Sequence, residues 1–334
     1  MTTGRAAPTL SRRRFGLWAV AGAVSLQPAC RGAAQSGGPP FLIGYLRRTA
    51  PIPGDLDAFR NALGELGARE GRRIAIEQRY AHGDPERLRA LAAELVAMGP
   101  SVLLVDGPLT VKAAMEATQV IPIVFAIGGT TESIGITSLS RPNANATGVL
   151  SNYAETSSKR MQILKEILPG LERLAVLSNP TNPFPESELA IREASKLLAL
   201  ETREFHASSP QDWPAAFAAM RRFGAGALLQ MGDATFASRP GELAALAAKA
   251  RLPAIYSERE FVDAGGLLSY GANLQANWRR AASYVDRILR GAKPGDLPIE
   301  QAALLELVVN LKSAQALGIT IPSELLARAN EVIE

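Results

Sequence analysis

The sequence has little of the chemistry on which many enzymes and metal sites depend. Its 334 residues include one cysteine and two histidines. A single cysteine excludes an intramolecular disulfide and any site with several cysteine ligands. His82 and His206 are isolated and lack paired acids, so we expect surface roles for both and no metal site.

Catalytic and nucleotide-binding motifs are also missing. The sequence contains neither the loop G-x-x-x-x-G-K-[S/T] nor the elbow G-x-S-x-G, and no G-x-G-x-x-G follows the first predicted strand. We therefore expect a protein that is not an enzyme and that has no cofactor.

Long basic runs of the kind that follow nucleic acid are absent. The formal net charge is +4, but residues 1–30 hold four arginines and no acid, and subtracting these four charges leaves zero. Beyond residue 30 the basic runs are no longer than pairs such as Arg72–Arg73 and Arg221–Arg222. We expect no nucleic-acid partner.

The first thirty residues have the pattern of an export signal. Ser11-Arg12-Arg13-Arg14-Phe15 resembles a twin-arginine motif, and the apolar run from Leu17 to Leu26 is too short to span a bilayer. Cys30 ends a segment that resembles a lipobox, so lipidation at Cys30 is one expectation and plain cleavage after Ala34 is the other. Either product is periplasmic, with contact to the membrane only through the lipid, and residues 31–40 form a tether.

What remains consists of two similar halves. Apolar residues make up 47% and charged residues 20%, as in globular proteins, and the length favours two domains. Predicted strands and helices alternate in the same order in both halves, offset by roughly 125 to 131 residues. The predicted strands are 41–46, 73–80, 102–105 and 122–127 in the first half, and 174–177, 201–205, 227–231 and 253–256 in the second.

Three further segments join the halves. Thr147 to Tyr153 is a predicted strand that crosses between them, Gly266 to Gly271 is a return, and Glu306 to Leu311 is a third crossing. A helix over Asn277 to Leu289 belongs to the first half, and Pro322 to Ile333 is a terminal helix. The predicted domains are an export signal (1–30), a tether (31–40), lobe 1 (41–149 plus 272–300), lobe 2 (150–271), and a third crossing with the C-terminal helix (301–334).

Strands alternating with helices predict an α/β fold of two doubly wound parallel-sheet lobes joined by a hinge. Ligands of such sheets bind beyond the carboxyl ends of the strands, where this sequence places residues with free hydroxyl, amide and carboxylate groups. The predicted ligand-binding residues are Tyr45, Thr110, Thr130, Ser151, Asn152, Asn179, Asn182, Asp233, Glu258 and Tyr270. We expect Trp213 and Trp278 to be packing residues.

Ordered blocks along residues 41–334 resemble the TrpX-like family of ABC transporter substrate-binding proteins. Among them are Phe59-Arg60-x-x-Leu63-x-Glu65-Leu66-Gly67, Gly83-Asp84-Pro85-Glu86-Arg87-Leu88, Ile121-Pro122-Ile123-Val124-Phe125, Leu252-Pro253-Ala254-Ile255-Tyr256 and Ala264-Gly265-Gly266-Leu267-Leu268-Ser269-Tyr270-Gly271. The resemblance implies a type I periplasmic binding protein fold that closes over one small polar ligand, amino-acid-like or another solute. It also implies a permease and an ATPase as partners, and we expect a monomer.

Two departures from the family pattern bear on the ligand. Many members carry Gly-Asp-Pro where this chain has Gly128-Gly129-Thr130-Thr131, so an acid that meets a ligand ammonium group is missing there. Asp106-Gly107-Pro108-Leu109-Thr110 replaces the usual Gly-Gly-Thr-Pro-Ala turn. Two alternatives stay open: a two-lobed enzyme such as a nucleotide-sugar transferase, using Asp106, Asp233 and Glu258, or a ligand-sensing domain for a membrane partner.

Overall fold

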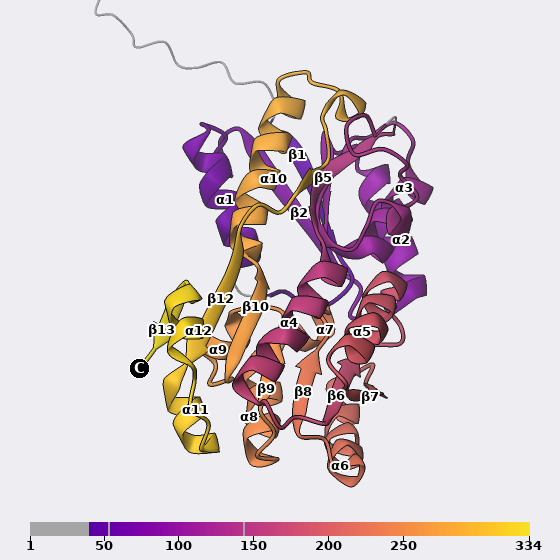
Figure 1. Ribbon diagram of the computed structural model, residues 1–334. Helices are drawn as coiled ribbons and strands as arrows, with labels where there is room; N and C mark the ends of the chain where they lie inside the picture. The colour runs from indigo at the N-terminus through magenta and orange to yellow at the C-terminus, as the bar shows by residue number, and fades with distance from the viewer. Residues whose placement is uncertain (1–39, 53, 143) are drawn as a thin grey trace, which may run out of the picture. The chain divides into compact units, whose positions relative to one another are not determined.

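A computed structural model describes residues 40–52, 54–142 and 144–334, which form two α/β lobes, each built on its own sheet (Figure 1). The predicted export signal, Cys30 and nearly all of the tether lie outside these residues. Within the described part of the chain, no helix is long and apolar enough to cross a membrane.

The sheet of the first lobe has six parallel strands in the order β11-β5-β4-β3-β1-β2. They are β1 (Phe41–Arg47), β2 (Ile74–Tyr80), β3 (Val102–Val105), β4 (Ile123–Gly128), β5 (Ala146–Ser151) and β11 (Glu300–Gln301). The central strands are apolar because helices cover both of their faces. The edge strand β2 is only partly buried, which matches its alternating sequence.

Two helices cover each face of this sheet. One face carries α1 (Asp55–Glu65) and α10 (Leu274–Leu289), and the other carries α2 (Pro85–Ala97) and α3 (Gly107–Ala117) (Figure 1). Phe59 and Trp278 fill the first core layer, and Leu95 and Val111 fill the second. The Asp84 carboxylate accepts hydrogen bonds from the first turn of α2, which confirms the predicted cap.

The sheet of the second lobe has seven strands in the order β13-β12-β10-β9-β8-β6-β7. They are β6 (Arg173–Ser178), β7 (Glu201–His206), β8 (Ala227–Gln230), β9 (Ala254–Tyr256), β10 (Leu268–Ala272), β12 (Leu305–Asn310) and β13 (Glu331–Ile333). The order β7-β6-β8-β9-β10 repeats β2-β1-β3-β4-β5 of the first sheet, so the predicted internal repeat is confirmed. β12 runs antiparallel to its neighbour β10 and β13 is parallel to β12, so these two strands run opposite to the other five.

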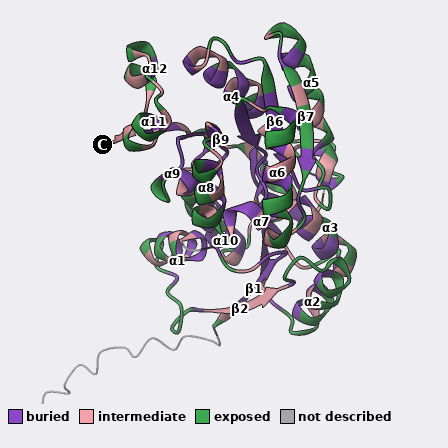
Figure 2. Ribbon diagram, turned by 90° about the horizontal axis from the view of Figure 1, so that it is seen from below, coloured by how far each residue is buried: buried purple, intermediate pink, exposed green. Residues whose placement is uncertain are grey.

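Helices also cover both faces of the second sheet, whose central strands β6, β8 and β9 are buried (Figure 2). One face carries α4 (Tyr153–Ile167), α5 (Pro185–Leu197), α11 (Leu311–Leu317) and α12 (Ser323–Arg328). The other carries α6 (Trp213–Phe223), α7 (Ala234–Ala237), α8 (Pro240–Lys249) and α9 (Glu260–Asp263). Trp213 is buried in this second layer, as predicted for a packing residue.

The chain passes between the two sheets three times. After β5 it enters α4 through Asn152, and after β10 it enters α10 through Asn273. Each asparagine caps the helix that follows: the Asn152 side chain accepts from Glu155 N at 3.2 Å, and the Asn273 side chain accepts from Ala276 N at 2.7 Å. The third passage is the segment 302–304 between β11 and β12. The Asn273 side chain donates at 2.7 Å to Glu306, which lies in β12 just after this segment.

Two sequence-based predictions need correction. The strand β5 ends at Ser151 and lies wholly in the first sheet, whereas Tyr153, predicted to be part of the crossing strand, begins α4. The helix predicted over Pro322 to Ile333 is instead the short helix α12 followed by β13, which pairs with β12 at the edge of the second sheet. The apolar residues of the tail fit both a helical and a strand periodicity, and pairing with the edge of β12 favours the strand.

Gly148 in β5 allows a close approach that a side chain would prevent. Its φ is 153°, and a Cβ there would lie 2.0 Å from the Phe125 carbonyl oxygen of β4. We expect Gly148→Ala to lower the free energy of unfolding by about 3 kcal/mol or more, because backbone atoms must move. Chemical denaturation measures this.

Gly64 provides the control, since it lies in α1 with only the Arg69 side chain near its Cβ position, at 3.9 Å. Gly64→Ala should be neutral or stabilise by up to about 1 kcal/mol. Equal stabilities of the two variants would contradict the packing of β5 against β4.

Candidate ligand-binding site

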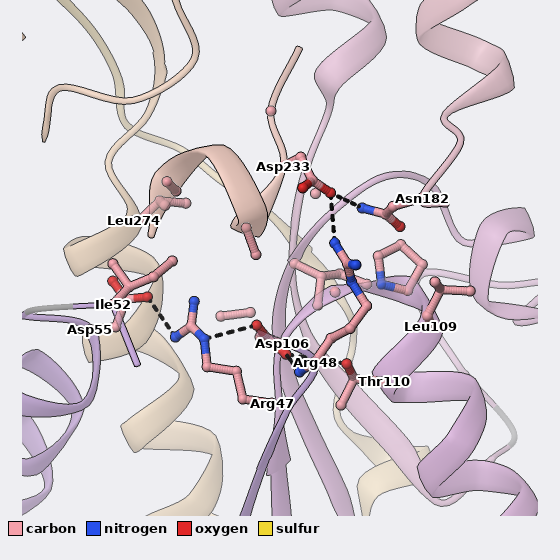
Figure 3. A pocket seen from close by; sticks show the side chains of 18 of the residues that line it. Arg47, Arg48, Ile52, Asp55, Asp106, Leu109, Thr110, Asn182, Asp233 and Leu274 are labelled. Atoms are coloured by element: carbon pink, nitrogen blue, oxygen red, sulfur yellow. Dashed lines mark hydrogen bonds and ion pairs between the residues drawn. The ribbon is translucent and has the colours of Figure 1, made fainter. Parts of the chain in front are cut away.

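A cavity of about 640 Å³, partly open to solvent, lies where the carboxyl ends of the two sheets meet (Figure 3). In both sheets the strand order changes direction between the first and third strands of the repeat, which is where doubly wound folds bind ligands. The lining of the cavity includes Arg47, Arg48, Ile52, Asp55, Asp106, Leu109, Thr110, Tyr153, Asn182, Phe184, Asp233, Glu258, Leu274 and Trp278.

Arg47 and Asp106 organise the side of the cavity formed by the first lobe. Arg47 Nη1 donates to Tyr45 OH at 2.8 Å and to an Asp55 oxygen at 2.9 Å, and Arg47 Nε lies 3.1 Å from Asp106 Oδ2. Asp106 Oδ1 accepts from the Arg48 amide and from Thr110 Oγ1, each at 3.2 Å. Burial raises the pKa of Asp55, although the charge of Arg47 opposes the shift. The positive charge of Arg47 is thus paired with the carboxylates of Asp55 and Asp106.

A buried ion pair joins the two lobes across the cavity. Arg48 Nη2 lies 2.8 Å from Asp233 Oδ2, and the two side chains are 8% and 2% exposed. Asp233 also accepts from Asn179, Asn182 and the Thr235 amide, at 3.0, 2.8 and 2.8 Å. Both Asp233 oxygens are therefore occupied, and this carboxylate is better suited to holding the lobes together than to binding a solute.

A second polar contact lies beside the ion pair. Thr130 Oγ1, from the loop after β4, donates to Glu186 Oε1 of α5 at 3.2 Å. Because both contacts join the first lobe to the second, the described structure has its lobes closed on one another.

Aromatic side chains form the apolar wall of the cavity. The Tyr153 ring packs edge-on against Phe184, with ring centroids 5.4 Å apart, and Trp278 packs edge-on against Tyr45 at 6.0 Å. A Cβ at Gly128 or at Gly232 would lie 2.1 or 2.7 Å from the Tyr153 ring. Two glycines, one from each lobe, thus make the space that this ring occupies. Burial raises the pKa of Tyr153 well above its ordinary value, so its hydroxyl stays protonated.

Glu258 is a buried carboxylate on the side of the second lobe. The Ser257 hydroxyl, which has one proton, lies within hydrogen-bonding distance of both Glu258 Oε2 and Gln230 Oε1, the latter at 2.8 Å, and the Gln230 carbonyl accepts from Arg160 Nη1 at 2.7 Å. Burial raises the pKa of Glu258 to about 7. Arg160 is fully buried, and burial lowers its pKa to about 10.

The structure brings four of the predicted ligand-binding residues to the cavity lining and places the other six elsewhere. Thr110, Asn182, Asp233 and Glu258 line it. Tyr45 and Asn179 lie behind it, holding Arg47 and Asp233 respectively. Of the rest, Thr130 makes the contact between lobes, Ser151 accepts from Asn277 Nδ2 at 3.0 Å, Asn152 caps α4, and Tyr270 packs against the core of the second lobe.

Sequence reasoning did not single out Arg47, Arg48, Asp55 or Phe184 as site residues, and it assigned Trp278 to packing alone. Trp278 does pack in the core, but it also lines the cavity. The available signal was the pair Arg47–Arg48 directly after a buried strand, where two cations need partners. His82 and His206 are exposed, as predicted, and the described residues contain no group of three His, Cys, Asp or Glu that could hold a metal.

The space beside Tyr153 generates a testable prediction. Gly128→Ala should lower the free energy of unfolding by about 1–3 kcal/mol, because its methyl group collides with the ring. Adding Tyr153→Ala should lower the free energy of unfolding by less in this variant than in the wild type, because it removes the ring with which the methyl group collides. A double-mutant cycle by chemical denaturation measures the coupling.

Gly170→Ala is the matched control, because no atom lies within 4 Å of its added Cβ. It should show no coupling to Tyr153→Ala. Additive effects of Gly128→Ala and Tyr153→Ala would contradict the described position of the ring.

Comparison with known proteins agrees with this architecture. A tyrosine-binding protein of Clostridioides difficile is 23% identical over 262 residues, which are 78% of this chain and 75% of the relative. Two solved structures share the fold over 88% of this chain and their whole length: a conserved domain protein of Vibrio cholerae (27% identical, TM-score 0.79) and an ABC domain of Streptococcus pneumoniae in complex with L-Trp (22% identical, TM-score 0.80).

The Clostridioides relative is described as tyrosine-binding and the Streptococcus structure holds L-Trp, whereas the description of the Vibrio protein gives no function. The family described as ABC transporter substrate binding protein matches residues 55–333, most of the chain. The chain belongs to the ABC transporter substrate-binding protein family.

Proposed function

We propose that this protein captures a small, polar, amino-acid-like solute between its lobes and delivers it to an ABC permease and its ATPase. It acts as a monomer in the periplasm, exported through its twin-arginine-like signal and held at the membrane if Cys30 is lipidated. The observation that carries the proposal is the cavity between the carboxyl ends of two sheets joined by three chain segments.

The connections between the lobes suit a closing motion. Asn152 and Asn273 each separate the end of a strand in one lobe from a helix of the other. A few residues at the ends of elements can absorb the φ and ψ changes of a hinge while both lobes keep their packing. In the closed form, Arg48 meets Asp233 and Thr130 meets Glu186. Ligand favours closure to the extent that it binds the closed form better than the open one.

The enzyme alternative finds little support in the cavity. It requires a cluster of carboxylates that can act as a base or hold a metal, yet Asp106 and Asp233 are each held by an arginine, which leaves only Glu258 of the three acids. A sensory role would use the same cleft with a different membrane partner. Neighbouring genes for a permease and an ATPase favour transport, and a neighbouring kinase gene favours sensing.

A solute screen tests the proposed function. We expect thermal shift to detect an amino acid among L-tyrosine, L-tryptophan and related solutes, because binding at a hundredfold excess over Kd stabilises the folded state by about 2.7 kcal/mol. Titration calorimetry should give one site per chain, and X-ray scattering should show a smaller radius of gyration with ligand. A protein that binds no small solute, or that binds one without compaction, would contradict the proposal.

The ion pair between the lobes provides a variant for the same experiments. Arg48→Met should leave the fold intact, because Asp233 keeps the donors Asn179, Asn182 and Thr235 N. It should weaken ligand binding by about tenfold or more and reduce compaction, since the closed form loses a buried charged contact.

Arg239→Met is the control, because Arg239 makes only an exposed pair with Glu242, which should contribute less than about 1 kcal/mol. If both variants bind and compact like the wild type, Arg48 does not hold the lobes closed.

A further inference from the structure

The charges around the cavity do not balance. Its lining carries the carboxylates of Asp55, Asp106, Asp233 and Glu258 and the guanidinium groups of Arg47 and Arg48. Arg47 lies against Asp55 and Asp106, and Arg48 lies against Asp233. Within the described residues no cation lies within ion-pair distance of Glu258. Both arginines are occupied, whereas one carboxylate at the cavity has no cation.

Glu258 is held in a fixed position. Its Oε2 is in hydrogen-bonding contact with the Ser257 hydroxyl, whose single proton is shared with Gln230 Oε1 at 2.8 Å. Gln230 Oε1 also accepts from the Ser257 amide at 3.1 Å, which holds this group of side chains together. The Tyr153 hydroxyl also lies within hydrogen-bonding reach of the Glu258 carboxylate. The Ser257 and Tyr153 groups are both uncharged hydroxyls, so the negative charge of Glu258 is left without an ion-pair partner among the described residues at the cavity.

Its surroundings favour a cation there. From α4, the Tyr153 hydroxyl and Arg160 face Glu258; Asp233 faces it from the end of β8, and Glu260 from α9. Arg160 faces the carboxylate without forming an ion pair with it: its guanidinium donates to the Gln230 carbonyl, the Thr156 carbonyl and Ser157 Oγ, and its charge only partly offsets the rise in the pKa of Glu258. Burial, together with the negative charges of Glu260 and Asp233, raises the pKa of Glu258 to about 7. An isolated buried carboxylate of this kind is costly unless it is protonated or paired.

We infer that Glu258 is the specificity-determining anchor for a positively charged group of the solute, so the preferred ligands are small molecules that carry an ammonium group. This inference rests on the proposed function and narrows its substrate class. Solutes whose only charges are negative, such as dicarboxylates and phosphates, are disfavoured, since they meet occupied arginines and a surplus of carboxylates. The anchor also supplies, from the second lobe, the acid that the loop Gly128-Gly129-Thr130-Thr131 lacks.

Matched ligands test the inference by titration calorimetry. The probes are L-tryptophan, tryptamine, which keeps the amine but lacks the carboxylate, and 3-(indol-3-yl)propionate, which keeps the carboxylate but lacks the amine. The wild type should bind L-tryptophan at least tenfold more tightly than the propionate, and it should bind tryptamine measurably. In Glu258→Gln, L-tryptophan and tryptamine should weaken by tenfold or more, while the propionate should bind equally well or better.

A change in preference cannot come from partial unfolding, which would weaken all three probes together. Glu260→Gln is the control: it removes a neighbouring charge without altering the cavity lining, so each affinity should stay within about threefold of the wild type. Equal loss of all probes in Glu258→Gln, or no loss of any, would overturn the inference. Failure of the wild type to bind either amine would do the same.

Proton release gives a second readout. At pH 7 about half of the empty molecules carry a proton on Glu258, because its pKa is about 7. A bound ammonium group stabilises the ionised carboxylate, so binding should release about half a proton per ligand at pH 7, and affinity should rise as pH increases from 6 to 8. Calorimetry in buffers of different ionisation enthalpy should detect the release in the wild type but not in Glu258→Gln.

The failure of the inference can be told apart from the failure of the proposed function. A wild type that binds polyols or amine-free acids, and compacts on binding, keeps its role as a solute-binding protein but contradicts the Glu258 anchor. A wild type that binds no small solute in the wider screen contradicts both.

Discussion

The structure depends on carboxylates that neutralise two consecutive buried arginines, Arg47 and Arg48, which lie at the carboxyl end of the buried strand β1. Arg47 ends β1 and Arg48 follows it, and each is less than a tenth exposed. Buried cations without partners cost several kcal/mol, so their environment must supply carboxylates. Asp55 and Asp106 come from the same lobe, while Asp233 comes from the other. Because Arg48 is neutralised by Asp233 of the other lobe, this ion pair forms only when the two lobes are closed.

The two lobes use the same topology for different purposes. Both sheets place polar side chains at the carboxyl ends of their first and third repeat strands. In the first lobe these residues are cations and their partners, and in the second the acceptor Asp233 follows the third strand β8, with Glu258 after the fourth strand β9. Asp233 forms an ion pair with Arg48 in the closed form, whereas Glu258 has no ion-pair partner among the described residues. We therefore assign Asp233 to the contact between the lobes and Glu258 to the contact with the solute.

Much of the fold follows from the sequence, because buried parallel strands and amphipathic helices leave strong periodic signals. The repeat, the helix cap at Asp84 and the two doubly wound lobes were predictable in this way, and the family resemblance added the binding-protein fold. The end of β5 and the structure of the tail were not predictable, because a short segment can fit both the helical and the strand periodicity, and only its tertiary contacts select one of them. Within the site, the strand ends gave Thr110, Asn182, Asp233 and Glu258. They did not reveal Arg47 and Arg48 as buried, since arginine is usually exposed and only the tertiary arrangement brings its carboxylates close.

The central claim is that solute binds between the carboxyl ends of the two sheets, with both arginines remaining neutralised by aspartates. A crystal structure of the protein with its tightest-binding amino acid tests this most directly. The account predicts a ligand that touches residues of both lobes, with its ammonium group within about 3 Å of Glu258 and Arg48 still paired with Asp233. A ligand held elsewhere, or one whose carboxylate takes Arg48 away from Asp233 while Glu258 stays unpaired, would contradict it.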